Sequence, residues 1–96
     1  MRRHENFTLL KDQIAVLENT ISTLAEELGE VNTPLSVKKI KRLAWDIAGV
    51  ENGAGVTLTQ VEASYKANWI DDVEYAELYA SLSLLLNRAT QLGLKV

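Results

Sequence analysis

Hydrophobic residues recur along residues 7–31 at spacings that alternate between three and four. They are Phe7, Leu10, Ile14, Leu17, Ile21, Leu24, Leu28 and Val31. This alternation is a heptad repeat, which predicts one amphipathic helix. With isoleucine at position a and leucine at position d, the repeat favours two parallel helices. We therefore predict a homodimer, joined through Leu10, Ile14, Leu17, Ile21 and Leu24.

The same helix also fits a second interpretation, as one member of an ordinary helical bundle. Leu9 and Val16 widen the hydrophobic stripe beyond a narrow seam, and the flanking positions offer few pairs of opposite charge. The repeat is also short, because Gly29 follows closely as a helix-ending residue. Both interpretations make this segment a helix.

A second helix is predicted from Thr33 and Pro34, which suit the cap and the first helical position, to about Gly49. A step of about 100° per residue separates two sides of it. The side predicted to face the core holds Val37, Ile40, Leu43, Ala44, Ile47 and Ala48. The opposite side, predicted to face solvent, holds Lys38, Lys41, Arg42 and Trp45.

Two further helices are expected in the C-terminal half. The glycines of residues 51–55 predict a loop, and Thr57 then suits the cap of a third helix. A break is predicted near residues 68–72, where Asp71 and Glu74 can form a capping box for a last helix that ends near Leu92. A second apolar stripe on this last helix, formed by Val73, Ala80 and Leu84, favours a further helix or another chain beside it.

Composition agrees with a helical fold. The 96 residues include only one proline and five glycines, too few for the many tight turns of a sandwich or barrel. We predict an all-α fold, a single domain over residues 1–96 with about four helices, in which residues 33–96 form the helical remainder after the heptad helix. No hydrophobic run has the length of a membrane span, and cysteine is absent. We therefore expect a cytoplasmic location.

Catalysis is not expected from this composition. The single histidine, His4, stands near the N-terminus, so neither a Ser-His-Asp arrangement nor a histidine-based metal site can be assembled convincingly in one chain. The carboxylates near residues 71–77 have sufficient roles as helix caps. We predict no enzymatic activity, no metal and no cofactor.

Charge is distributed unevenly, although the formal sum is only -3. Residues 33–50 carry four basic groups and one acidic group, whereas the segments before and after each carry three basic and six acidic groups. Trp45 stands among the cations Lys38, Lys41 and Arg42 on one helical face. Tryptophan and arginine are common among residues that dominate interfaces. We predict a regulator, inhibitor or adaptor that binds an acidic protein surface through these four residues.

Two alternatives remain open for this face. Trp45 can instead pack over a neighbouring side chain, with the acidic residues of the first helix offsetting the lysines. A dimeric nucleic-acid-binding protein could also use the same basic helix to contact phosphates. The overall acidic composition disfavours that second alternative, because strong binding of nucleic acid needs a broad basic face.

Overall fold

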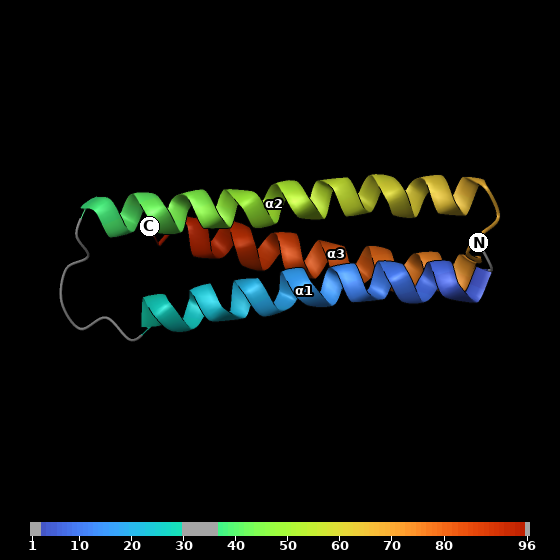
Figure 1. The fold of residues 1–96 in the computed structure, drawn as a ribbon, viewed down its shortest axis with the longest axis horizontal. Helices are drawn as coiled ribbons and strands as arrows, with labels where there is room; N and C mark the ends of the chain where they lie inside the picture. The colour runs from blue at the N-terminus through green and yellow to red at the C-terminus, as the bar shows by residue number, and fades with distance from the viewer. Residues whose placement is uncertain (1–2, 30–36, 96) are drawn as a thin grey trace.

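The computed structural model describes residues 3–29 and 37–95, and within them the chain forms three helices and no strand. Helix α1 spans Arg3–Gly29, α2 spans Val37–Lys66 and α3 spans Asp72–Gly93. Successive helices run in opposite directions along a rod of 50 × 19 × 17 Å (Figure 1). The all-α class is therefore confirmed, but the bundle has three described helices rather than about four.

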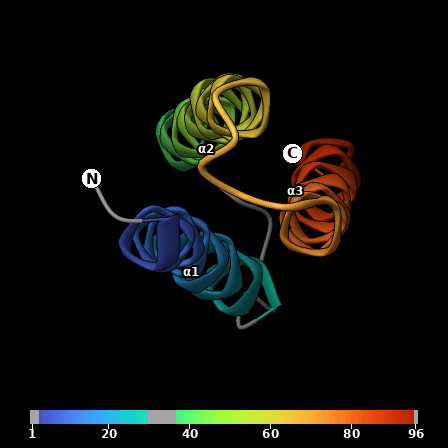
Figure 2. The same cartoon turned by 90° about the vertical axis from the view of Figure 1, so that its right-hand side faces the viewer.

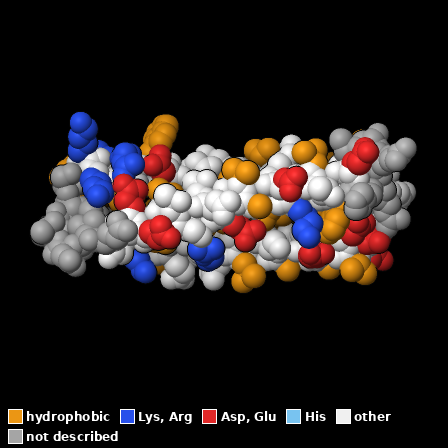
Figure 3. All heavy atoms as spheres, turned by 60° about the horizontal axis from the view of Figure 1, so that its bottom comes forward, with side chains coloured by type: hydrophobic (Ala, Val, Ile, Leu, Met, Phe, Trp, Pro, Cys, Tyr) orange, Lys and Arg blue, Asp and Glu red, His pale blue; other side chains and the backbone are white. Residues whose placement is uncertain are grey.

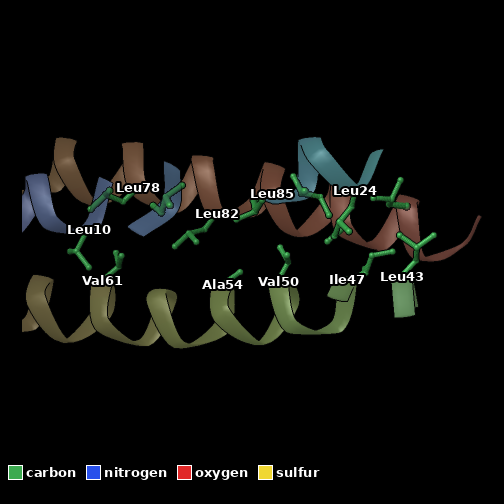
Figure 4. Close-up of a cluster of buried hydrophobic side chains, with 14 of the residues drawn as sticks. Leu10, Leu24, Leu43, Ile47, Val50, Ala54, Val61, Leu78, Leu82 and Leu85 are labelled. Carbon is green, nitrogen blue, oxygen red and sulfur yellow. The ribbon is translucent and has the colours of Figure 1, made fainter. Parts of the chain in front are cut away.

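The three helices surround one continuous core (Figure 2). The core residues of α3 alternate at spacings of four and three, and those of α1 and α2 do so apart from one gap of seven residues in each. These residues are Leu10, Ile14, Ile21 and Leu24 in α1; Leu43, Ile47, Val50, Ala54 and Val61 in α2; and Leu78, Leu82, Leu85, Ala89 and Leu92 in α3. Leu43, Ile47, Val50 and Val61 point from α2 toward the leucines of the other two helices (Figure 4). Each helix thus presents a heptad-like stripe to the core, and the three helices pack as an antiparallel three-helix bundle.

Helix α2 continues through residues 51–55, where the sequence predicts a loop, so that prediction is wrong. Thr57 likewise does not cap a helix, because it lies in the middle of α2 and donates a hydrogen bond from Oγ1 to the Gly53 carbonyl oxygen at 2.9 Å. Each helical glycine costs about 1 kcal/mol relative to alanine. Burial of Val50 and Val61, on either side of this segment, contributes roughly 1.5–3 kcal/mol each and offsets that cost.

Gly53 allows α1 to approach α2 closely. A Cβ atom at this position would lie 2.9 Å from Leu17 Cδ2, closer than side chains normally pack. At Gly49 and Gly55 a Cβ would meet nothing within 4 Å. Of these three helical glycines, only Gly53 lies where a side chain would disturb the packing of a neighbouring helix.

The break predicted near residues 68–72 is confirmed. Asn68, two residues after the end of α2, has φ of 63°, the left-handed conformation that asparagine tolerates better than most residues. The Trp69 N–H then donates to the Ser64 carbonyl at 2.9 Å, as in a Schellman motif. Asp71 and Glu74 form the predicted capping box at the start of α3.

The solvent and core sides of α2 agree only in part with the helical-wheel prediction. Leu43 and Ile47 are buried and Ile40 is half-buried, as expected. Val37, Ala44 and Ala48 were expected to face the core but are exposed. The core-facing stripe is narrower than predicted, because two helices rather than three pack against α2. The predicted start of this helix at Thr33 and Pro34, and Val31 of the heptad repeat, lie outside the described residues.

Three tyrosines join α2 to the first turns of α3. The rings of Tyr65 and Tyr75 stack with centroids 4.4 Å apart, and Tyr79 continues the stack 6.0 Å from Tyr75. Tyr65 also donates a hydrogen bond from its hydroxyl to the Asp72 carboxylate. This hydrogen bond, together with the negative charge of Asp72, raises the pKa of Tyr65 above its ordinary value. The neutral phenol is therefore favoured where the two helices meet.

Candidate protein-binding surface

The four residues predicted to bind a partner all lie in the first turns of α2. Lys38, Lys41, Arg42 and Trp45 are all exposed, and Trp45 is the most exposed large hydrophobic side chain described, at 80%. Figure 3 shows Lys and Arg side chains grouped at this end of the bundle, with Asp and Glu side chains beside them. We name these four residues the Trp45 surface.

Arg42 differs from the two lysines in being engaged within the chain. Its Nη2 donates a hydrogen bond to Glu27 Oε1 on α1, and its Nη1 lies 4.0 Å from Asp46 Oδ2 one turn along α2. Lys38 and Lys41 form no ion pair with any described residue. Arg42 therefore joins α1 to α2, while Lys38 and Lys41 present their charge to solvent.

A groove of about 530 Å³ between α1 and α2 adjoins Trp45. Its lining residues are Leu17, Thr20, Thr23, Leu24, Glu27, Arg42, Trp45, Asp46, Gly49 and Val50. Leucine and valine side chains form its apolar part, the two threonines line the α1 side, and Glu27, Arg42 and Asp46 are its charged members. We name it the Trp45 groove. Its volume lies within the range of roughly 300–1,000 Å³ that is usual for binding sites.

The α1 half of this groove was not identified from the sequence. Thr20 and Thr23 lie on the polar side of the heptad helix, and their hydroxyls donate to backbone carbonyls four residues earlier, at 2.9 and 3.0 Å. Nothing in their sequence spacing distinguishes them from ordinary solvent-facing residues. Only the antiparallel pairing of α1 with α2 brings them opposite Trp45.

A second groove of about 440 Å³ lies toward the other end of the same two helices. Leu9 and Trp69, each nearly half exposed, lie beside Gln13 and Gln60 in its lining. Asn6 also lines it, and the side-chain Nδ2 of Asn6 is buried without a hydrogen-bond partner. The lining contains no charged residue, in contrast to the Trp45 groove.

The five residues predicted to join two chains lie inside this one. Leu10, Ile14, Ile21 and Leu24 belong to the buried core, and Leu17 packs against it. Their partners in the structure are therefore the other two helices of the same chain. A dimer formed through these residues would first require α1 to leave its own bundle.

The described residues contain no group of three histidine, aspartate or glutamate side chains placed to hold a metal ion. None of the described helices combines the length and the apolar character that crossing a membrane requires. His4 lies in the first turn of α1, outside the side chains that the structure describes.

Comparisons of the chain with protein-family models, with curated proteins and with solved structures found no match.

Proposed function

We propose that this chain is a small, non-catalytic binding module that engages a protein partner through the Trp45 surface and the Trp45 groove. The observation that supports the proposal most directly is an 80% exposed tryptophan at the edge of a groove of about 530 Å³. Exposing so large an apolar ring to water is unfavourable, and burying it against a partner recovers that free energy. Tryptophan is also the residue type most enriched among interface hot spots.

The groove suits an aliphatic or aromatic side chain from the partner. Leu17, Leu24 and Val50 offer apolar contacts, while Thr20 and Thr23 keep the α1 side polar but uncharged. A partner side chain placed here would lie against the Trp45 ring. This arrangement matches the general anatomy of an interface, with an apolar centre surrounded by a polar rim.

Charge favours an acidic partner. Lys38 and Lys41 have no ion pair among the described residues, so a carboxylate from the partner would meet an uncompensated cation. The charge of Arg42 is already offset by Glu27 and Asp46. Of the predicted cations, Lys38 and Lys41 are the ones expected to select the partner, whereas Arg42 maintains the groove.

The same observations make nucleic acid the less favoured partner. Glu27 and Asp46 lie beside the basic residues and would repel a phosphate backbone. A protein surface can place its carboxylates opposite the lysines and its apolar groups over the groove, which a regular phosphate backbone cannot do.

The test is affinity capture from the native host with the immobilised full chain, followed by mass spectrometry. Wild type is compared with Trp45→Ala and with Val56→Ala, a control that removes an exposed apolar side chain elsewhere on α2. We expect one protein to be retained by wild type and by Val56→Ala and to be lost with Trp45→Ala. Retention of every captured protein by Trp45→Ala would overturn the proposal.

A direct assay distinguishes a nucleic-acid partner from a protein partner. Random duplex DNA is titrated at physiological salt, and the titration is repeated with the Lys38→Glu and Lys41→Glu double variant. We expect weak binding. Submicromolar affinity with a steep salt dependence that the double variant loses would replace the proposed protein partner with nucleic acid.

A further inference from the structure

The side of α3 that points away from the core carries a line of exposed, uncharged side chains, three of them apolar. With about 100° per residue, Val73, Ala80, Leu84 and Gln91 fall within about 40° of one another. All four are exposed, Val73 at 76% and Leu84 at 67%. We name these four residues the α3 outer face. It extends for about 27 Å along the helix, at a rise of about 1.5 Å per residue.

Charged side chains occupy many exposed positions of the other two helices. Exposed positions of α1 include Lys11, Asp12, Glu18 and Glu26, and those of α2 include Lys38, Lys41, Glu62 and Lys66. In α3, residues 79–87 contain no charged side chain at all. Exposed apolar side chains that line up on one helix face are typical of an interface.

We propose that the α3 outer face binds the same face of a second copy of this chain, with the two α3 helices antiparallel. In the register centred on residue 82, Ala80 of each copy lies opposite Leu84 of the other. A large side chain thus packs over a small one on both sides of the two-fold axis. Isologous contacts of this kind are the most common form of homodimer.

Charge at the edge of the face favours the antiparallel direction. Glu77 and Arg88 lie on the same flank of α3, beside α1, where Lys11 Nζ is 3.6 Å from Glu77 Oε1 and Arg88 Nη2 donates to Ser22 Oγ at 3.1 Å. In the antiparallel register, Glu77 of one copy faces a position one residue from Arg88 of the other copy. The two-fold symmetry repeats this pair on the other side of the axis. Parallel helices would give Glu77 no cation, because α3 contains no basic residue before Arg88.

Arg88 can form this contact without leaving Ser22. The guanidinium carries five N–H donors, and only one nitrogen is used for the Ser22 hydroxyl. Glu77 is about half exposed and likewise retains accessible oxygens. The intramolecular contacts therefore orient both side chains at the edge of the face.

This interface is separate from the Trp45 groove, which is lined only by residues of α1 and α2. The C-terminal end of α3 lies near the start of α2, where the Trp45 surface is located (Figure 1). An antiparallel α3 pair therefore places the two Trp45 surfaces toward opposite ends of the dimer. Each copy can then bind its own partner.

Sedimentation equilibrium of the full chain at micromolar concentrations tests the proposal. We expect twice the chain mass of 10.7 kDa for wild type and a single chain mass for Leu84→Glu. The matched control is Val16→Glu, which changes an apolar side chain of similar exposure, 64%, on α1. It should remain dimeric. A monomeric wild type, or a dimer that Val16→Glu disrupts and Leu84→Glu does not, would overturn the proposal.

Charge reversal tests the direction of pairing independently of the apolar substitution. Glu77→Arg and Arg88→Glu should each weaken the dimer by roughly tenfold, because each creates like charges across the interface twice. The double variant should recover most of the wild-type dimer affinity. Circular dichroism checks that all variants remain helical. Additive weakening in the double variant would exclude the antiparallel pairing.

Discussion

Trp45 and Leu84 are both large, exposed hydrophobic side chains, at 80% and 67%, yet their surroundings differ completely. Trp45 lies beside a groove between two helices and has exposed cations for neighbours. Leu84 lies on one helix in a stretch of nine residues without charge. The first environment is asymmetric, with a cavity and a net charge that call for a complementary partner. The second is uncharged around Leu84, and we propose that it binds the same face of a second copy.

Exposure alone therefore does not assign a role to a hydrophobic side chain. Single exposed apolar residues are common and carry little information. What distinguishes these two is the chemistry within one or two helical turns of each. Three predictions test how far the two surfaces depend on the core and on the packing of the helices.

The largest expected effect is that of Ile21→Asp. Ile21 is only 1% exposed, so the substitution places an unpaired carboxylate in the core, at a cost of several kcal/mol. A chain of this size has little stability beyond that, and we expect it to lose its helical structure. Far-ultraviolet circular dichroism measures the loss. A variant that stays fully helical but becomes monomeric would instead assign dimerisation to the α1 seam and not to the α3 outer face.

An intermediate effect is expected for Leu43→Ala, and a much smaller one for Trp45→Ala. Leu43 is completely buried, and its truncation should lower the free energy of unfolding by about 2–5 kcal/mol. Trp45 lies in solvent, so its truncation should change that free energy by at most about 0.5 kcal/mol. Chemical denaturation gives both values. If Trp45→Ala were the more destabilising variant, Trp45 would be part of the core and the binding surface would lose its centre.

The smallest effects are expected at the glycines of α2. Gly55→Ala should stabilise the chain by about 0.5–1 kcal/mol, because helical glycine is unfavourable and the added methyl meets no atom within 4 Å. Gly53→Ala should gain less, since Leu17 must shift to admit the methyl group. Thermal melts compare the two. An equal gain at both positions would show that α1 does not need its close approach to α2 beside the Trp45 groove.

Regular features of the sequence predicted much of this fold. The heptad helix, the break near Asn68 and the Asp71 capping box depend on local patterns, and the structure contains all three. The loop predicted from the glycines of residues 51–55 was wrong, because the preference of a glycine for turns is weak compared with the burial of residues on both sides of it. The unbroken spacing from Leu43 through Ala54 to Val61 was the stronger signal.

Less of the candidate binding site could be predicted from the sequence. Exposure of Trp45 follows from helical geometry, and the sequence predicted it. The groove beside Trp45 depends on which helix pairs with α2 and in which direction. The contact of Arg42 with Glu27 and the position of Thr20 depend on the same pairing. Residues fifteen or more positions apart come together only through tertiary packing, which no local spacing encodes.

The most direct measurement is the affinity of the captured partner for wild type and for Trp45→Ala, obtained by isothermal titration calorimetry at matched concentrations. Removing the ring should cost on the order of 2 kcal/mol of binding free energy, which corresponds to a dissociation constant about 30-fold higher. The melting temperature of the variant should stay close to that of wild type. An unchanged affinity would contradict the assignment of the Trp45 surface as the binding site.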